Sequence, residues 1–435
     1  MKNTKSPYAL GGRTWAAVLI FGLFGQIAWV IENMYFNVFL YNTISGDPAM
    51  IAAMVSASAV TATVTTLVMG ALSDKIGRRK ALIVVGYLLW GVSVAAFAFI
   101  SVENIGKFFP AAQAAQATAI AVVVMDCVMT FFGSTANDAA FNAWVTDVTV
   151  PENRGRVETV LAVLPLVAML VVFGALDGLT QSGNWSTFFL VVGGLTLLGG
   201  VLGIFFLREK KQTQRSDEPY FANIIYGLRP SVIRANPALY ISLAALAIYS
   251  MSQQVYMPYL IIYIQRFLGI ADYVILLGGV LILSSVVSVL LGKTVDKYGK
   301  LRCLTPAAAV GFVGLVLMYL ARSQWFVFVA GVVMLGSGMV VAACCQGLIR
   351  DYTPQGKAGL FQGIRILFQV LIPMVTGPFI GVAVIRNTGM TYEDLGTVKQ
   401  VPTAEIFLAA AIVLLLLVVP VRLLKKKEAA ERSVK

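Results

Sequence analysis

Long apolar stretches separated by short polar segments run along the whole chain. A bilayer core of about 30 Å needs roughly 20 apolar residues in one helix, and twelve stretches of that length occur in 435 residues. The pattern predicts an all-α membrane protein with twelve transmembrane helices. The stretches cover residues 14–41, 49–72, 81–101, 115–146, 157–177, 185–207, 237–265, 272–292, 303–321, 324–348, 360–385 and 403–423.

The longest polar segment divides these stretches into two sets of six. It covers residues 208–236 and is rich in Lys, Arg, Gln, Ser and Asp. We therefore predict an N-terminal six-helix bundle over residues 1–207, a cytoplasmic linker over 208–236, and a C-terminal bundle with a basic tail over 237–435.

Composition narrows the class of protein. Charged residues make up 12% of the chain and hydrophobic residues 58%, whereas a soluble domain is about a quarter charged. Most of the surface must therefore face lipid. The chain has no histidine and four cysteines without C-x-x-C spacing, which removes the usual ligands of zinc and the usual nucleophile–base pairs. We expect no enzyme activity, no metal and no cofactor.

The formal net charge of +12 reflects membrane topology. With a cytoplasmic N-terminus, 28 of the 33 Lys and Arg residues fall on the inner side of the predicted helices. Cytoplasmic segments of membrane proteins carry such an excess and contact anionic lipid headgroups. We expect a multi-pass protein of the cell membrane with both termini cytoplasmic, and no nucleic-acid partner.

A short motif after the second stretch recurs after the eighth, and both copies fall in predicted cytoplasmic loops. Glycines permit sharp turns and close helix contacts, and an Asp beside basic residues can form charge-assisted hydrogen bonds. Such bonds, broken and remade, suit a gate with two states. The first copy is Gly70, Asp74, Gly77, Arg78 and Arg79; the second, 222 residues later, is Gly292, Asp296, Gly299 and Lys300, with Leu301 in place of the second basic residue.

A second pair of landmarks supports an internal duplication. Asp147-Val-Thr149 recurs as Asp351-Tyr-Thr353, 204 residues later. Duplicated halves are a common architecture of transporters. The loop motif and the repeat resemble the major facilitator superfamily, a resemblance that implies two pseudo-symmetric six-helix bundles working by alternating access.

Three carboxylates lie within predicted helices, namely Glu32, Asp126 and Asp138. A charge at the bilayer centre costs at least about 2.5 kcal/mol and is usually functional. Because burial favours the neutral form of a carboxyl group, such a side chain can bind and release a proton. We therefore expect these acids to couple transport to a cation.

Helical phase groups polar residues into two candidate stripes for solute binding. At about 100° per residue, Glu32 and Asp138 lie roughly 100–120° away from these stripes. The stripes are Asp126, Thr130, Gly133 and Asn137 on the fourth helix, and Gln26, Asn33 and Asn37 on the first.

A narrower resemblance concerns Asp138. The segment from Asn137 to Thr149, followed by Asn153-Arg-Gly-Arg156, resembles the fourth helix and following loop of the glycoside–pentoside–hexuronide:cation symporters, the melibiose permease-like family. The resemblance implies that Asp138 binds the coupling cation. The paired acids of that family's second helix are missing, and Arg365 and Gln369 are the nearest candidates for its eleventh-helix lysine. Proton coupling is thus favoured over sodium.

Aromatic and amide side chains on the seventh helix predict a solute face. Tyr249, Gln253 and Tyr256 share one stripe, and Gln346 is a further candidate. Such groups suit the apolar faces and hydroxyl rim of a sugar, although ordinary aromatic packing explains the same stripe. The leading hypothesis is cation-coupled symport of a small polar solute such as a sugar or glycoside. The alternatives are a drug or lysolipid exporter of the same fold and a membrane sensor that transports nothing.

Overall fold

The computed structural model describes residues 10–208, 227–354, 358–394 and 397–433. Within these ranges, twelve helical spans are long and apolar enough to cross a membrane, which confirms the predicted all-α fold and the number of helices. The spans are Gly12–Thr43, Pro48–Ser73, Arg79–Phe99, Ala111–Val148, Val160–Gln181, Trp185–Phe206, Pro237–Phe267, Tyr273–Gly292, Lys300–Leu320, Gln324–Tyr352, Gly363–Thr388 and Glu405–Ala430.

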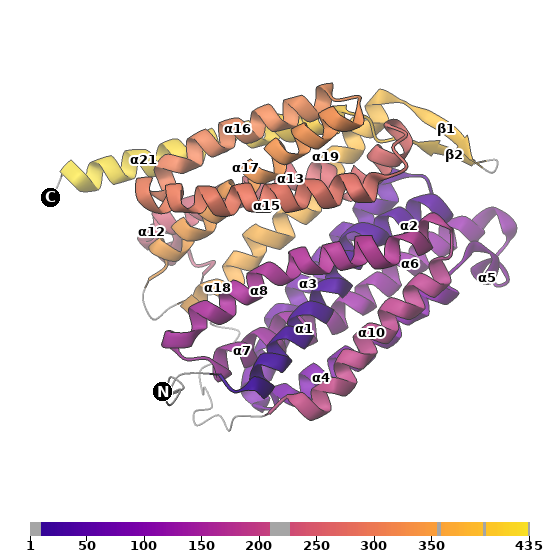
Figure 1. Cartoon of the computed structure of the whole chain (residues 1–435), viewed down its shortest axis with the longest axis horizontal. Coiled ribbons are helices and arrows are strands. Elements are labelled where there is room, and N and C mark those ends of the chain that lie inside the picture. The colour runs from indigo at the N-terminus through magenta and orange to yellow at the C-terminus, as the bar shows by residue number, and fades with distance from the viewer. Residues whose placement is uncertain (1–9, 209–226, 355–357, 395–396, 434–435) are drawn as a thin grey trace, which may run out of the picture. The chain divides into compact units, whose positions relative to one another are not determined.

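The chain forms two compact units (Figure 1). The N-terminal unit comprises Met1–Ser45 and Val60–Glu218, and the C-terminal unit comprises Gly46–Ala59 and Pro219–Lys435. Most of the predicted linker, residues 208–236, lies outside the described residues, which resume at residue 227. The first part of the second span belongs to the C-terminal unit, so helix α3 (Pro48–Ile76) runs through both units.

The helices of the N-terminal unit are interrupted by short π-helical or 3-10 segments, labelled η. The first span is α1 (Gly12–Val30), η1 (Ile31–Tyr35) and α2 (Phe36–Thr43), followed by α3. The remaining elements are α4 (Arg79–Ala96), η2 (Phe97–Phe99), α5 (Val102–Gly106), α6 (Ala111–Gly133), η3 (Ser134–Phe141), α7 (Asn142–Val148), α8 (Pro151–Val171), η4 (Val172–Leu176), α9 (Asp177–Gln181) and α10 (Trp185–Phe206).

The C-terminal unit follows the same plan and adds a hairpin. Its first elements are α12 (Pro230–Ala235), α13 (Pro237–Tyr256), η5 (Met257–Tyr259), α14 (Leu260–Ile262), η6 (Tyr263–Phe267), α15 (Tyr273–Tyr298), α16 (Lys300–Leu320) and α17 (Gln324–Tyr352). They are followed by α18 (Ala358–Ile366), η7 (Leu367–Leu371), α19 (Ile372–Thr388), β1 (Thr391–Asp394), β2 (Thr397–Gln400), α20 (Glu405–Leu415) and α21 (Val418–Ser433).

Small residues bring the helices of each unit into close contact. A Cβ placed on Gly193 of α10 would lie 2.7 Å from the carbonyl oxygen of Gly91 in α4, and one placed on Gly314 of α16 would lie 2.7 Å from the backbone of Met334 in α17. Lipid tails are as apolar as the side chains, so no hydrophobic driving force brings membrane helices together. They associate instead through close packing of this kind.

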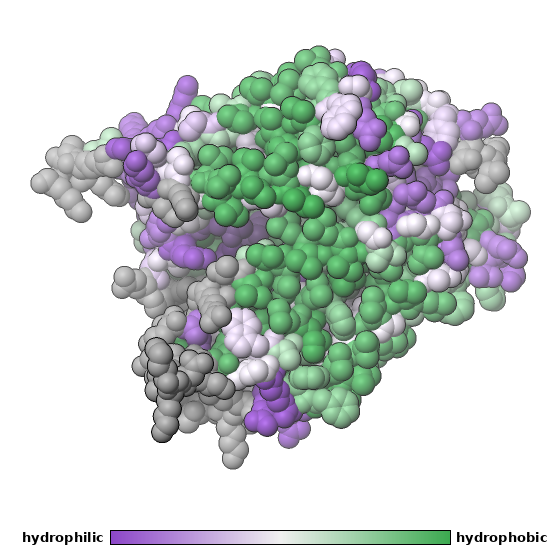
Figure 2. All heavy atoms as spheres, viewed as in Figure 1, coloured by the Kyte–Doolittle hydropathy of each residue, from purple (hydrophilic) through white to green (hydrophobic). Residues whose placement is uncertain are grey.

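Large apolar side chains cover the outside of the spans. In α3, Val60, Val64 and Val68 are exposed at helical spacing, and in α15 Val289 is 75% exposed. Figure 2 shows apolar residues over most of the visible face. A soluble protein rarely exposes so large an apolar surface, and a lipid environment satisfies it.

The β-hairpin was not predicted. Strands β1 and β2 pair antiparallel, with Thr391 opposite Gln400. The backbone amide of Gln400 donates to the carbonyl of Gly46, 3.1 Å away, and Arg386 pairs with Asp47 at 3.3 Å. These contacts attach the start of the second span to the C-terminal unit. The polar segment 387–402 carries no apolar run that would have marked strands in the sequence.

Candidate functional site

Both copies of the loop motif turn at a glycine with positive φ. Gly77 has φ 66° and Gly299 has φ 93°, values that side chains other than glycine rarely tolerate. Each glycine ends one helix where the next begins, between α3 and α4 and between α15 and α16. The sequence expectation of a sharp glycine turn at both positions is confirmed.

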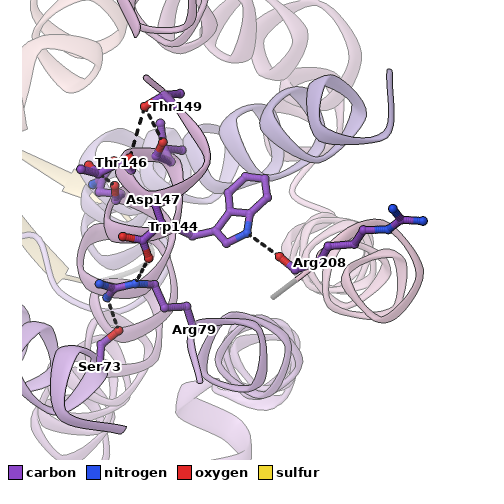
Figure 3. A network of polar contacts seen from close by, with 9 residues as sticks. Ser73, Arg79, Trp144, Thr146, Asp147, Thr149 and Arg208 are labelled. Atoms are coloured by element: carbon purple, nitrogen blue, oxygen red, sulfur yellow. Dashed lines mark hydrogen bonds and ion pairs between the residues drawn. The ribbon is translucent and has the colours of Figure 1, made fainter. Parts of the chain in front are cut away.

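An ion pair follows each turn. Nε of Arg79 pairs with Oδ2 of Asp147, and Nη1 of Arg79 donates to the hydroxyl of Ser73 over 2.8 Å. Figure 3 shows this network beside Trp144, whose indole donates to the carbonyl of Arg208. The arrangement joins the motif to the second landmark of the repeat. The side chain of Asp74 lies outside the described residues, as does that of Asp296.

The second copy uses the neighbouring position. Nζ of Lys300 lies 2.7 Å from Oδ1 of Asp351, and Asp351 is the repeat of Asp147. Lys300 aligns with Arg78 rather than with Arg79, whose counterpart is Leu301. The basic residue of the second ion pair thus stands one position earlier in the motif than Arg79 does in the first. The long lysine side chain still reaches Asp351. Arg78 is exposed.

Glu32 and Thr130 form the centre of an acidic site in the N-terminal unit. The hydroxyl of Thr130 donates to Oε1 of Glu32 over 2.9 Å. Glu32 is 8% exposed and Thr130 is fully buried. Asp126, 1% exposed, precedes Thr130 by four residues and so lies on the same face of α6. The N-terminal unit therefore buries two acids, Glu32 in hydrogen-bond contact with Thr130 and Asp126 one helical turn from Thr130.

Glu32 lies in the π-helical segment η1, which changes the helical phase along the first span. In a regular α-helix Glu32 would lie away from the polar stripe. A π turn holds one extra residue, which rotates the following residues by about 100°. Glu32 is the second residue of this segment and accepts a hydrogen bond from Thr130 of α6. π-helical turns occur frequently at functional sites.

Asp138 has a different hydrogen-bond partner from Glu32. It belongs to the π-helical segment η3, and its Oδ2 accepts from the hydroxyl of Ser134 over 3.1 Å. Ser134 is four residues earlier in the same segment. Asp138 is partly buried, and it is held by its own helix while Glu32 is held by a neighbouring one.

The polar residues predicted on the first helix bond mainly to that helix. Nδ2 of Asn33 donates to the carbonyl of Trp29 over 2.7 Å, and Nδ2 of Asn37 donates to the carbonyl of Asn33 over 2.9 Å. Asn33 is exposed, whereas Asn37 is fully buried and Gln26 is partly buried.

Asn137 connects three helices. Its Oδ1 lies 3.2 Å from the hydroxyl of Tyr87 in α4, and that hydroxyl lies 2.8 Å from the carbonyl of Phe21 in α1. A Cβ on Gly25 would lie 2.9 Å from the Asn137 amide. Asn137 therefore serves the packing of α1, α4 and η3 at a position next to Asp138.

Sequence reasoning missed Asp177, a fourth buried acid. It is 1% exposed and accepts from the Tyr35 hydroxyl over 2.7 Å and from the Gln181 amide over 2.5 Å. The predicted fifth helix ended at residue 177, whereas helix α9 continues to Gln181. The spacing of Asp177, Thr180 and Gln181 on one helical face was the available signal.

The predicted aromatic face of α13 lines a small cavity. Tyr249, Gln253 and Tyr256 meet Leu315, Met334 and Leu414 around a volume of about 20 Å³. That volume holds one water molecule and no sugar. The Tyr256 ring packs at 5.3 Å from that of Phe407. The three residues lie together as predicted, and in this structure they pack against α16, α17 and α20.

Gln346 belongs to a different cluster of the C-terminal unit. Nη2 of Arg365 donates to Oε1 of Gln346 over 2.6 Å, and Nε donates to Oε1 of Gln369 over 3.2 Å. The three side chains come from α17, α18 and η7. The cluster joins a cation and two amides, with Arg365 two residues inside the eleventh span.

Comparison with known proteins agrees with this architecture. A family model described as Major Facilitator Superfamily matches residues 14–321 and, overlapping, 243–435. No curated protein matches the sequence.

Solved structures show the same fold. A mutant form of the nucleoside transporter NupG superposes with a TM-score of 0.72 at 12% identity, over 95% of this chain and 99% of that one. A bacterial homologue of the human lysosomal transporter Spinster, in an inward-facing and unoccupied conformation, gives 0.72 at 14% identity, over 97% and 98%.

Proposed function

Because the chain belongs to the Major Facilitator Superfamily, we propose that it is a secondary active transporter that couples a small polar solute to a cation. The observation that carries the proposal is the contact of Glu32 with Thr130, one turn from Asp126. Buried acids within membrane spans are rare and mark proton relays and ion pathways. A packing role alone would be met by apolar residues at lower cost.

A proton is the better candidate for the coupling ion. A carboxyl group can take up and release a proton, and Glu32 and Asp126 are both buried within the spans. Sodium prefers several oxygen ligands, and the helix that carries acids in the resembling sodium-coupled symporters has hydroxyl residues here. Asp138, partly buried next to Asn137, is proposed as a further member of the coupling system.

The proposed solute is a sugar or glycoside. Amide and hydroxyl side chains within the spans, including Gln26, Asn33 and Gln346, offer hydrogen bonds to a hydroxyl-rich molecule. A transporter of the same fold is described as a nucleoside transporter, and a nucleoside is itself a small polar solute with a sugar ring. The resemblance to glycoside symporters points to the same class.

The loop motifs are proposed as the gate of an alternating-access cycle. The pairs Arg79–Asp147 and Lys300–Asp351 occupy equivalent places in the two units. Their breaking and re-forming would bias the protein between its two states. The distribution of Lys and Arg favours a cytoplasmic position for these loops and both termini, with the protein in the cell membrane.

Uptake into proteoliposomes tests the proposal. The purified protein is reconstituted, and uptake of a panel of sugars, glycosides and nucleosides is measured with a proton gradient, a sodium gradient or neither. We expect accumulation of at least one solute driven by the proton gradient and abolished by a protonophore. Uptake that ignores both gradients would reduce the function to facilitated diffusion, and accumulation driven only by sodium would exclude proton coupling.

A further inference from the structure

Tyr35 joins two interrupted spans of the N-terminal unit. It is the last residue of η1 and is fully buried. Its hydroxyl donates to Oδ1 of Asp177 over 2.7 Å, and Asp177 follows η4 as the first residue of α9. The centre of the Tyr35 ring lies 6.3 Å from that of Phe173, which belongs to η4. One side chain thus connects the π-helical segment of the first span to that of the fifth.

Asp177 closes η4 with its backbone and binds Tyr35 with its side chain. Its amide donates to the carbonyl of Val172, five residues earlier, which is the hydrogen bond that defines a π turn. Its carboxyl group also accepts from the Thr180 hydroxyl over 3.4 Å and from the Gln181 amide over 2.5 Å. Hydrogen bonds in a buried network strengthen one another. The bond to Tyr35 is therefore part of a network that includes three other residues.

Glu32 lies in the same five-residue segment as Tyr35, three residues earlier. It accepts from Thr130 of α6 over 2.9 Å, and the amide of Phe36 closes the segment with a π-type bond to the carbonyl of Ile31. The segment η1 is therefore held by α6 near its start and by α9 at its end. Because the segment is short, the position of its end affects where Glu32 lies relative to Thr130.

We propose that Asp177 is a positioning residue: through Tyr35 it fixes the end of η1 and so holds Glu32 at its donor on α6. The inference rests on the proposed function, which makes Glu32 the coupling acid. Proton binding by Glu32 and the hydrogen bond between Tyr35 and Asp177 then affect each other, because coupling between two sites is reciprocal. Asp177 itself carries no proton in the transport cycle.

Titratable groups near Glu32 have to stay constant in a test of this role. Asp126 and Cys127 lie on α6, and the charges of Glu32 and Asp126 both act on the Cys127 thiol. The variant Tyr35→Phe changes neither of them and leaves the carboxyl group of Asp177 in place. A change in the titration of Glu32 in that variant therefore reports the loss of one hydrogen bond at the end of η1.

Infrared spectroscopy of the full-length protein in nanodiscs measures the protonation of Glu32 without solute or gradient. The absorbance of protonated carboxyl groups is titrated against pH, and the part due to Glu32 is identified by its loss in Glu32→Gln. Tyr35→Phe keeps the ring against Phe188, with the ring centres 5.1 Å apart. We expect it to shift the midpoint of Glu32 by at least about 0.5 pH unit, about threefold in proton affinity, in the same direction as Thr130→Val.

A double variant separates positioning from a general loss of packing. If both changes act through the place of Glu32, the shift in Tyr35→Phe/Thr130→Val is smaller than the sum of the single shifts. Thr196→Val is the matched control, because Thr196 is buried and its hydroxyl donates to the carbonyl of Val192 in its own helix. It should leave the midpoint unchanged. An unchanged midpoint in Tyr35→Phe, single shifts that add, or an equal shift in Thr196→Val would overturn the inference.

Transport distinguishes a positioning role of Asp177 from a coupling role. Asp177→Asn should keep accumulation driven by a proton gradient in proteoliposomes, whereas Glu32→Gln should lose it. Loss of accumulation by Asp177→Asn with exchange intact would make Asp177 a coupling acid and overturn its positioning role. A protein that ignores both gradients but shows the smaller combined shift keeps this inference and loses the coupling proposal. A parent protein whose Glu32 does not titrate would contradict both.

Discussion

The two units share the geometry of their loops and differ in the chemistry within their spans. Each has a glycine turn with positive φ followed by an ion pair, at Gly77 and at Gly299. The N-terminal unit carries buried acids such as Glu32 and Asp126, whereas the C-terminal unit carries Arg365 with two amides. The loop determines how the helices join and is constrained in both halves. The residues within the spans differ between the units: the N-terminal unit contains acidic side chains there, and the C-terminal unit contains a basic one.

This difference supports a division of labour between the units. Acidic side chains attract cations and protons, and a guanidinium with amide donors attracts anions and acceptor groups. We therefore expect changes at the acids to affect coupling more strongly than changes in the C-terminal unit do. The predictions below test that division and then the shared loop geometry.

The largest effect is expected for Glu32→Gln. The amide keeps the size and the contact with Thr130 but cannot carry a proton, so accumulation driven by a proton gradient should fall to background. Exchange of labelled for unlabelled solute across the membrane should continue, because it requires no net proton movement. The measurement compares both kinds of uptake in the same proteoliposomes. Asp138→Asn is expected to behave alike.

Thr130→Val serves as the matched control for Glu32→Gln. It removes the hydrogen bond and leaves the acid, so coupling should weaken without disappearing. Full gradient-driven accumulation by Glu32→Gln would remove the acid from the mechanism, and loss of exchange together with accumulation would mean a defect in folding or solute binding instead.

The ion pairs of the two loops are expected to differ in strength. Arg79 and Asp147 have side chains that are 7% and 27% exposed, whereas Lys300 and Asp351 are 33% and 51% exposed. Breaking a buried pair costs about 3–5 kcal/mol, and breaking an exposed pair about 0–1 kcal/mol. Since Asp147 is only partly buried, Asp147→Asn should destabilise the protein by about 2–3 kcal/mol.

Thermal unfolding in detergent measures this contrast. Asp351→Asn should lower the unfolding temperature much less than Asp147→Asn. A double-mutant cycle over Arg79 and Asp147, and another over Lys300 and Asp351, would give the two coupling energies directly. Equal coupling energies in both cycles would show that the Lys300–Asp351 pair is as strong as the Arg79–Asp147 pair, although its basic residue stands one position earlier in the motif.

The glycine turns should respond alike in both units. A residue with a side chain pays about 1–2 kcal/mol in the left-handed helical region, so Gly77→Ala should destabilise by about that amount. Gly299, at φ 93° and ψ 144°, lies in a region close to glycine-only, so Gly299→Ala should cost at least as much. Gly292→Ala is the control, because Gly292 lies within α15 and a Cβ there meets no atom within 4 Å. Alanine should be neutral or stabilising at that position. Destabilisation by alanine at only one of Gly77 and Gly299 would show that the two loops do not share the same backbone requirement.

The sequence predicts the spans well because a bilayer imposes a length and an apolar composition on every crossing helix. It does not reveal the π-helical segments, since one inserted residue leaves the hydropathy of a span unchanged. Glu32, which accepts a hydrogen bond from Thr130, lies in one of these segments. Asp177 was missed because the end of its helix was placed four residues early. Gln346 was a candidate, but its partner Arg365 became clear only when two helices met.

The smallest effect is expected for Tyr249→Phe on α13. Its hydroxyl lies near Gly338, where an added Cβ would be 2.8 Å away, and its ring lines a cavity of about 20 Å³. Loss of one hydroxyl from such packing should change solute uptake less than about threefold, which is about 0.6 kcal/mol. Gln253→Leu at the same cavity is the companion variant. A tenfold loss of uptake by Tyr249→Phe, with thermal stability unchanged, would instead place the solute on this aromatic face.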